Sequence, residues 1–262
     1  MGNRLGLGIA AGSDPDQLAE LAAAAEGLGF GSTWCNDSPA GEGLAQLWSW
    51  AGHAGSIDLG VGVLALDRHD PATIAERARE LELPLDRVVF GLGAGFTSQP
   101  LGVVRAGVAA LRAALPGARV AVAAMGPKMC ELAGELGDAV LLNWMTPERA
   151  AWARPLVEDG ARRAGRDPSA VTIYAYVRCA MGPGAGERLA REAGMYMQMP
   201  HYRRHFEAMG AEPSNAGVAA ADGAALVAGL ARYDAVDEPV VRVLSHRAAP
   251  DILTVARAAV GR

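Results

Sequence analysis

Apolar runs and amphipathic runs alternate along this chain from one end to the other. Segments such as 87–93 and 171–181 are almost continuously apolar and β-branched, which is typical of strands buried on both faces of a sheet. The segments between them carry apolar residues with helical spacing over about ten to fifteen positions. This alternation predicts repeated βαβ units and a parallel sheet.

The pattern assigns a strand or a helix to most of the sequence. Strands are predicted at residues 4–10, 32–35, 57–66, 87–93, 171–181 and 239–245, with two more inside 120–144. Helices are predicted at residues 14–28, 44–53, 71–83, 103–115, 147–164 and 251–260, with one more inside 120–144, and segment 186–232 reads as mostly helical. About eight such units at this length close into a (β/α)8 TIM barrel. An open, doubly wound sheet is the alternative, because local patterns do not show closure.

Segment 120–144, VAVAAMGPKMCELAGELGDAVLLNW, contains a complete βαβ unit. A buried strand leads into a tight turn at Gly126 and Pro127, and an amphipathic helix, a closing Gly137 and a second strand follow. Glycine lets a ligand approach the backbone, and proline suits the first helical turn. The free N–H groups at such a helix start predict a phosphate site.

Composition narrows the function classes. The 262 residues are 51% hydrophobic and 20% charged, and no linker or low-complexity segment divides them, so we expect one domain over residues 1–262. The net charge of -5 argues against nucleic acid as a partner. Cys35, Cys130 and Cys179 lack metal-ligand spacing and are expected to be free thiols in a reducing compartment. With neither a signal peptide nor an apolar run of about 18 residues, we expect a cytoplasmic protein without a membrane partner.

Several clusters at predicted strand ends are candidates for chemistry. Asp37, in the run Asn36-Asp37-Ser38, either handles a proton or merely caps the following turn. The glycines in GLGAG at 91–95 and in LGVG at 59–62 permit a close ligand approach, although both patterns are also common in purely structural turns and bulges. The cluster 67–70, DRHD, resembles a catalytic cluster, but surface ion pairs and capping ahead of Pro71 explain it equally well, and we favour that interpretation.

The C-terminal half adds one further cluster. His201 and His205 have metal-ligand spacing, but Arg203 and Arg204 lie between them and no HExxH motif is present, so no metal site is expected. The Met- and Tyr-rich run around them is expected to cover the barrel mouth and to border a substrate pocket.

Five separated pieces of the chain, in order, resemble the luciferase-like oxidoreductases, the superfamily of bacterial luciferase and of the enzymes that use the deazaflavin coenzyme F-420. They are LGFGSTWCND at 28–37, LGVGVLALDRHDP at 59–71, DRVVFGLGAG at 86–95, the βαβ segment 120–144, and MYMQMPHYRRHFEAMG at 195–210. The resemblance covers nearly the whole chain, and segment 120–144 is its most specific part. It implies a luciferase-like TIM barrel with short insertions.

The resemblance also implies the positions of the site residues. A bulge in the third strand, with a non-prolyl cis peptide between Gly62 and Val63 and with Leu64 following, is expected behind the cofactor ring. Asp37 is expected to face the ring as the catalytic residue, and Asn143 and Trp144 are expected to border the cofactor or substrate. The expected phosphate contacts are Gly93, Ala94, Gly95, Ala123, Ala124, Met125 and Gly126.

The function implied is hydride transfer between coenzyme F-420, an 8-hydroxy-5-deazaflavin, and a small organic substrate. An FMN-dependent monooxygenase and a non-catalytic flavin-binding relative are the alternatives. Ser38 stands where some relatives carry a histidine, which favours reduction of an activated substrate over alcohol oxidation. Arg68 and Arg178 are candidates to bind the cofactor's acidic tail. The link between Gly95 and Val120 is short, so the pocket is either open or completed by a partner subunit. The resemblance implies a homodimer.

Overall fold

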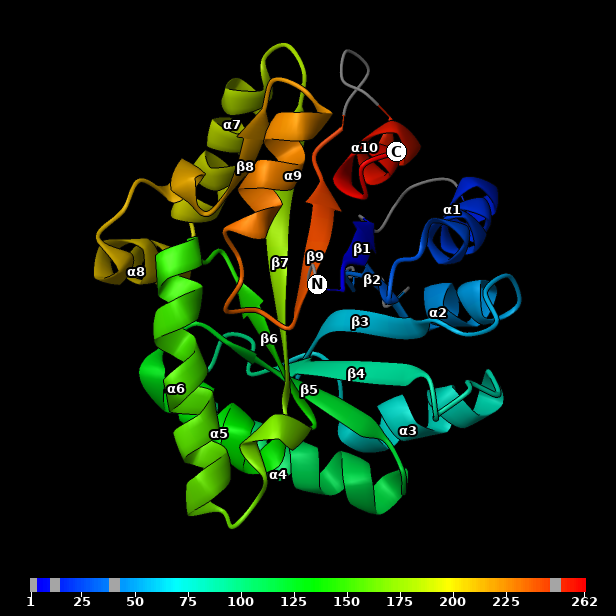
Figure 1. Ribbon diagram of the computed structural model, residues 1–262. Helices are drawn as coiled ribbons and strands as arrows, with labels where there is room; N and C mark the ends of the chain where they lie inside the picture. Colours follow the sequence, from blue (N-terminus) through cyan, green and yellow to red (C-terminus); the bar gives the residue numbers. More distant parts are fainter. Residues whose placement is uncertain (1–3, 10–14, 38–42, 246–250) are drawn as a thin grey trace.

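The computed structural model describes residues 4–9, 15–37, 43–245 and 251–262, and its strands and helices alternate as the sequence predicts (Figure 1). The strands are β1 (Gly6–Ile9), β2 (Ser32–Cys35), β3 (Asp58–Ala65), β4 (Val88–Gly93), β5 (Arg119–Ala124), β6 (Ala139–Asn143), β7 (Thr172–Met181), β8 (Gly217–Ala220) and β9 (Glu238–Val243). The α-helices are α1 (Pro15–Leu28), α2 (Gly43–Ala51), α3 (Pro71–Glu80), α4 (Pro100–Ala114), α5 (Pro127–Leu136), α6 (Pro147–Arg163), α7 (Ala185–Met197), α8 (Pro200–Met209), α9 (Gly223–Ala231) and α10 (Ile252–Ala259). Two short 3-10 helices cover Pro168–Ala170 and Pro213–Asn215.

The strands form a closed parallel barrel. Strands β1 to β6 pair in sequence order, β6 pairs with β7, β7 pairs with β9, and β9 pairs with β1. Eight strands therefore complete the ring, with helices outside it (Figure 1). The (β/α)8 TIM barrel predicted from the sequence is confirmed, and the open-sheet alternative is wrong.

One strand was not predicted. Strand β8 lies in segment 186–232, which the sequence pattern assigned mostly to helix, and it pairs with the last four residues of β7. Because β7 is ten residues long, its first half pairs with β6 and its end remains available for β8. The β8 sequence GVAA has only one β-branched residue, so strand propensity gives little signal there.

Side chains that point into the barrel fill it by matching large residues with small ones. The inner cluster consists of Trp34, Val89, Ala121, Ala139, Leu141, Tyr174, Tyr176 and Val240, with Val63 packed against it. The Trp34 ring lies 4.8 Å from the Tyr174 ring. A Cβ atom on Gly60 would come within 2.2 Å of Trp34, so glycine at this position makes room for the indole.

The amino end of the barrel is closed by polar contacts. The Ser32 hydroxyl donates to the buried Glu238 carboxyl, which also pairs with Arg4 at 3.4 Å. Arg119 forms a two-pronged ion pair with Asp58, at 2.8 and 3.1 Å. Burial raises the pKa of Glu238. These contacts fill the lower end of the barrel, so any ligand space has to lie at the carboxyl end of the strands, where ligands of TIM barrels bind.

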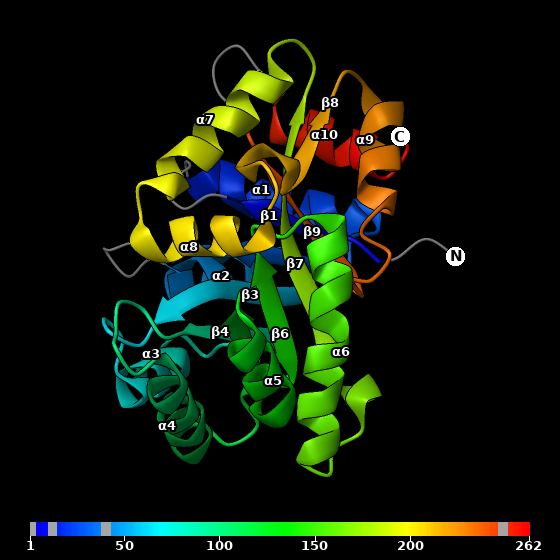
Figure 2. The same ribbon diagram turned by 90° about the vertical axis from the view of Figure 1, so that its left-hand side faces the viewer.

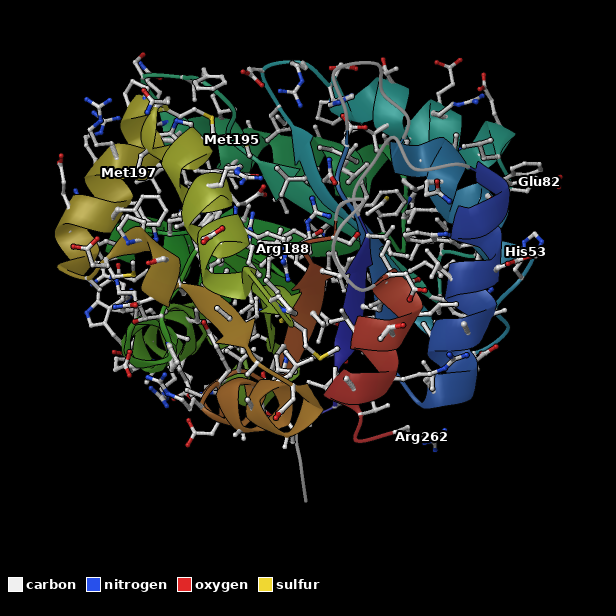
Figure 3. All side chains as sticks on the ribbon, turned by 90° about the horizontal axis from the view of Figure 1, so that it is seen from above. His53, Glu82, Arg188, Met195, Met197 and Arg262 are labelled. Atoms are coloured by element: carbon white, nitrogen blue, oxygen red, sulfur yellow. The ribbon has the colours of Figure 1, made fainter. Side chains whose placement is uncertain are left out.

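Helices α7 and α8 pack beside the carboxyl ends of β6 and β7. In Figure 2, α8 lies across the front of the barrel, directly below α7. A separate apolar cluster holds these helices to the barrel, made of Trp144, Leu189, Ala193, Phe206 and Ala216. Figure 3 shows α7 from above, with its labelled residues Arg188, Met195 and Met197. None of the described helices has the length and apolar character needed to cross a membrane.

Candidate functional site

The barrel interior is accessible at the carboxyl ends of the strands. Five inward-facing residues there are half-buried, whereas the interior residues one layer below them on the same strands are buried. On β3 the bulge lies between these two layers, which are represented there by Val63 and Gly60. These five, which we call the mouth ring, are Asn36, Val63, Ala123, Asn143 and Arg242. Each follows an inner-cluster position by two residues or packs directly against that cluster. Since they point inward and still meet solvent, solvent reaches the barrel interior at this level.

Strand β3 bulges at the edge of the mouth ring. The peptide bond between Gly62 and Val63 is cis, as the resemblance implied, and the pairing register with β4 shifts between Gly62 and Leu64. The bulge turns Val63 toward the inner cluster and leaves Leu64 buried in the outer core. A Cβ atom on Gly62 would lie 2.6 Å from the Tyr176 hydroxyl, which donates to the Gly62 carbonyl at 3.3 Å. The bulge therefore requires glycine at position 62.

The end of β4 contributes residues without side chains, Gly93 and Gly95, to the mouth. Gly93 lies between Val63 and Ala123, because a Cβ atom there would be 2.9 Å from Val63 and 3.8 Å from Ala123. Gly95 has a φ of 68° and lies under the Asp67 carboxylate, which accepts the N–H of Phe96 at 2.8 Å. Val63, Ala123 and the bare Gly93 form an apolar surface on one side of the mouth, which we call the floor.

The end of β5 leads into an uncapped helix. Gly126 is the N-cap of α5, no side chain caps that helix, and a Cβ atom on Gly126 would meet nothing within 4 Å. Met125 and Gly126 are half-buried, whereas the Ala124 side chain is buried in the outer core. Of the predicted phosphate residues, Ala124 therefore offers only its backbone, and the first turn of α5 offers free N–H groups.

Asp37 lies at the end of β2 with both carboxylate oxygens engaged. Oδ1 accepts the N–H of Gly43, the first residue of α2, at 3.1 Å. Oδ2 lies 2.8 Å from Nε2 of His69 and 3.9 Å from the Arg68 guanidinium. The Asp37 side chain is 1% exposed and the His69 side chain is 22% exposed. Both sequence interpretations of Asp37 thus have a structural counterpart, since it caps α2 and also holds an imidazole.

His69 is the site residue that the sequence analysis missed. The interpretation of segment 67–70 as capping and surface ion pairs is correct for Asp70, which accepts the N–H groups of Ala72 and Thr73 at the start of α3. It is wrong for His69, whose partner is a buried carboxylate 32 residues earlier. Only the adjacency of parallel β2 and β3 brings these two loops together. Ser38, singled out in the sequence, lies outside the described residues.

The far side of the mouth is polar and aromatic. Asn143 donates from Nδ2 to the Tyr202 hydroxyl on α8 at 2.9 Å, and its Oδ1 accepts from the Arg178 guanidinium. Burial raises the pKa of Tyr202 to about 12, so its phenol stays protonated. Asn143 lies in the mouth ring. Trp144 does not, because it is fully buried in the cluster under α7 and α8.

The two histidines of α8 have separate packing roles. His205 donates from Nε2 to the Trp144 carbonyl at 2.7 Å, and burial lowers its pKa. The His201 ring lies edge-on to Phe96 at 5.1 Å, which joins α8 to the loop after β4. Among the residues that the structure describes, no group of three or more His, Cys, Asp or Glu side chains is arranged to hold a metal ion.

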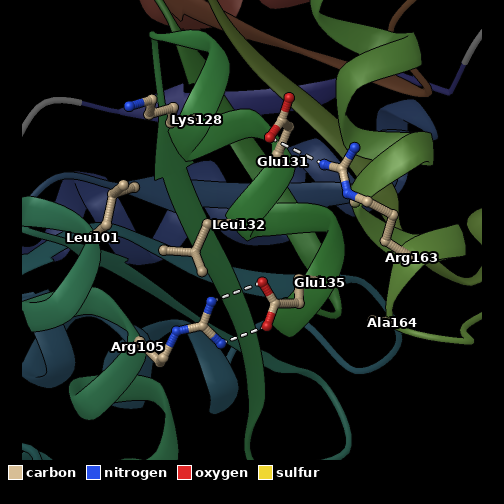
Figure 4. Close-up of a pocket in the computed structure, with 9 residues that line it drawn as sticks. Leu101, Arg105, Lys128, Glu131, Leu132, Glu135, Arg163 and Ala164 are labelled. Carbon is tan, nitrogen blue, oxygen red and sulfur yellow. Dashed lines mark hydrogen bonds and ion pairs between the residues drawn. The ribbon is translucent and has the colours of Figure 1, made fainter.

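A hollow of about 500 Å³ lies elsewhere, on the outer face formed by α4, α5 and α6 (Figure 4). Arg105 pairs with Glu135 across it, and Arg163 pairs with Glu131 at 3.0 Å. These two ion pairs neutralise the arginines and glutamates that line it, and none of the mouth-ring residues lines it. We assign the candidate site to the barrel mouth on these grounds.

Known proteins with similar sequences identify the family to which this architecture belongs. A family model described as luciferase-like monooxygenase matches residues 1–103 and 103–238. A 5,10-methylenetetrahydromethanopterin reductase from Methanolobus tindarius is 32% identical over 200 residues, which is 63% of this chain and 61% of that protein. The chain thus matches about three fifths of the length of that relative.

Solved structures show the same fold at lower identity. An F420-dependent secondary alcohol dehydrogenase in complex with an F420-acetone adduct superposes with a TM-score of 0.79 at 20% identity, covering 100% of this chain and 98% of that one. A 3,6-diketocamphane monooxygenase component from Pseudomonas putida, in complex with FMN, superposes with a TM-score of 0.66 at 15% identity, covering 99% and 97%.

Proposed function

Since this chain belongs to the luciferase-like monooxygenase family, we propose that it is an oxidoreductase that transfers a hydride between the deazaflavin coenzyme F-420 and a small organic substrate at the barrel mouth. The observation that carries the proposal is the His69–Asp37 pair, in which a buried carboxylate holds a partly exposed imidazole on the loop after β3, the strand that contributes Val63 to the floor. The reductase relative, which matches over part of its length, supports the choice of cofactor.

The residues at the mouth suit a flat cofactor with a phosphate. Val63, Gly93 and Ala123 leave a surface without protruding side chains, on which a planar ring would lie. Gly126 leaves the first turn of α5 open, and its N–H groups would bind the phosphate together with the backbone of residues 93–95 and 123–125. When bound, the deazaflavin supplies the hydride chemistry.

His69 and Asp37 divide the proton handling between them. A carboxylate only accepts hydrogen bonds, so the hydrogen bond to Asp37 fixes the proton of His69 on Nε2. The Nδ1 atom of His69, which has no hydrogen-bond partner among the described residues, is then the atom that gives or takes the substrate proton. Asp37, with both oxygens engaged and almost no exposure, orients the imidazole. The catalytic role predicted for Asp37 accordingly becomes a positioning role in this proposal, and His69 takes the proton-transfer step.

The alternative function is an FMN-dependent monooxygenase. A monooxygenase component with the same fold binds FMN, and this supports the alternative. The ring and phosphate of FMN are similar to those of the deazaflavin. A flavin monooxygenase also needs a site that excludes water and an acid–base group, so the same residues would have the same roles in that reaction. The cofactor titration at the end of the Discussion separates the two functions.

Turnover is the direct test of the proposed function. Purified protein is mixed with reduced F-420 and a panel of activated acceptors, then with oxidised F-420 and a panel of alcohols, and the absorbance of the oxidised deazaflavin is followed. Acceptor-dependent oxidation of the reduced coenzyme supports the proposal. If the coenzyme binds but is neither oxidised by any acceptor nor reduced by any alcohol, the result would instead favour the non-catalytic relative.

Two partner predictions stay open to measurement. The substrate is expected to be a small molecule, because the mouth ring is bounded by α8 and by the loop after β4, which meet through His201 and Phe96.

A homodimer is also expected, and Trp48 on α2, 58% exposed, is an apolar side chain that such an interface would cover. Light scattering of the purified chain measures its mass in solution directly.

A further inference from the structure

We propose that Arg178 and Arg242 form a subsite for the carboxylate group of the substrate. The inference rests on the proposed function in one respect: the bound anion is a substrate because the subsite opens into the mouth where the reaction is proposed to occur. The two arginines come from β7 and β9, the neighbouring strands opposite the apolar floor in the order of the sheet. The site would therefore hold an anionic compound by one end and present the remainder to the floor.

The strand register brings the two side chains to one place. Arg178 and Arg242 are direct partners in the parallel pairing of β7 with β9. Each lies two residues beyond an inner-cluster residue, Tyr176 and Val240 respectively, so both point into the barrel. Arg178 is 2% exposed and Arg242 is half-buried within the mouth ring. Two guanidinium groups consequently lie side by side at the inner end of the mouth.

Neither arginine has an acidic partner among the described residues. Arg178 donates to Asn143 Oδ1 and lies over the Trp144 ring at 4.1 Å and the Tyr196 ring at 5.2 Å, and its Nε is buried without an acceptor. Arg242 donates to Asn36 Oδ1 at 3.2 Å. By contrast, the interior arginine at the other end of the barrel, Arg119, has Asp58.

This arrangement is costly without an anion. Buried charges are normally paired, because a buried guanidinium loses its hydration. Burial, followed by the charge of Arg178, lowers the pKa of Arg242. Glu192 on α7, which is half-buried, acts on Arg242 in the opposite sense, but it forms no ion pair with Arg242 among the described residues. The aromatic rings and the two asparagines compensate only part of the cost, and an oxyanion would supply the missing countercharge and an acceptor.

The geometry favours a carboxylate of the substrate over an acidic group of the cofactor. Arginine's planar fork matches a carboxylate, with two parallel N–H donors. The predicted cofactor phosphate site lies at the ends of β4 and β5, and a tail beyond that phosphate would leave the barrel, whereas Arg178 is buried inside it. Arg178 was a sequence candidate for that tail, and the structure favours the substrate role instead.

The test measures carboxylate binding without any cofactor. Acetate, benzoate and hexanoate are titrated into the purified protein, with acetamide, benzamide and hexanamide as neutral matches, and binding is followed by intrinsic fluorescence, to which the buried Trp144 contributes. We expect at least one carboxylate to bind and its amide to bind at least tenfold more weakly. We expect Arg242→Gln to weaken the carboxylate at least tenfold and the exposed control Arg191→Gln on α7 to leave it unchanged.

Several results overturn the proposal. These are the absence of binding by all three carboxylates, equal binding of acids and amides, or an Arg242→Gln variant that folds and binds as the parent does. The melting temperature is the folding control, and it should stay level or rise in Arg242→Met, because that change removes an uncompensated buried charge. A fall in F-420 affinity in Arg242→Gln would assign the subsite to the cofactor tail. If carboxylate binding depends on Arg242 but the protein binds no F-420, the result would support the subsite and contradict the proposed function.

Discussion

Nε2 of His69 lies 2.8 Å from Oδ2 of Asp37, although 32 residues separate the two in the chain. The carboxylate comes from the end of β2 and the imidazole from the turn after β3, and the pairing of those strands places them together. Asp37 also caps α2 through Gly43. The same carboxylate thus fixes the helix and the imidazole at the mouth of the barrel.

Removing the imidazole should stop proton transfer without loss of cofactor. We expect His69→Gln to lower turnover by roughly 100-fold or more, the usual contribution of a positioned acid–base group, with the dissociation constant for F-420 within about twofold of the parent. Turnover and fluorescence titrations on the same preparation measure both quantities. A variant with parental turnover would remove His69 from the reaction.

Asp37 is expected to show two separable effects. Asp37→Asn keeps an oxygen for the Gly43 N–H but loses the charge behind His69, so turnover should fall while the melting temperature holds. Asp37→Ala removes the cap as well, and should cost a further ~0.5–2 kcal/mol of unfolding free energy. If both variants lose stability and activity in proportion, Asp37 is a structural cap and no more.

The phosphate assignment is tested at Gly126. A side chain there meets open space, so Gly126→Glu should fold normally, while its charge would repel a phosphate at the start of α5. We expect F-420 and FMN affinity to drop roughly 100-fold, a difference of about 2.7 kcal/mol. Gly102→Glu on α4, also in open space, is the matched control with unchanged affinity. Parental affinity in Gly126→Glu would refute the assignment.

The barrel packing predicts opposite effects at two glycines. Gly60→Ala forces a Cβ atom to within 2.2 Å of Trp34, and we expect a loss of about 1–3 kcal/mol of unfolding free energy. Gly102→Ala in α4 meets nothing within 4 Å and should gain roughly 0.5–1 kcal/mol from helix propensity. Denaturant unfolding of both variants measures the difference. A Gly60→Ala variant as stable as the parent would show that Trp34 can move aside.

His205 should make stability depend on pH. Burial lowers its pKa in the folded protein below the ordinary 6.5, so the unfolded chain binds this proton first as the pH falls. The stability that His205 contributes is therefore complete above about pH 6.5 and is lost on acidification below it. We expect His205→Gln to flatten the decline in melting temperature between pH 7 and pH 5, with the exposed His53→Gln as control. Parallel curves for parent and His205→Gln would contradict this account.

The sequence predicted the barrel because its strands are continuous apolar runs with helices between them, a local property. It did not predict β8, since Gly217–Ala220 has little strand propensity and forms only because the long β7 offers it an edge. The cis peptide at Gly62 was located through the family resemblance rather than through propensity. The pairing of His69 with Asp37 and of Arg178 with Arg242 depends on strand register, which no local pattern contains.

The cofactor is the central claim, and a pair of fluorescence titrations of the purified chain, with F-420 and with FMN, tests it most directly. The account predicts micromolar binding of F-420 and clearly weaker binding of FMN. Binding of FMN alone would favour the monooxygenase, and binding of neither would contradict the assignment of the barrel mouth as a deazaflavin site.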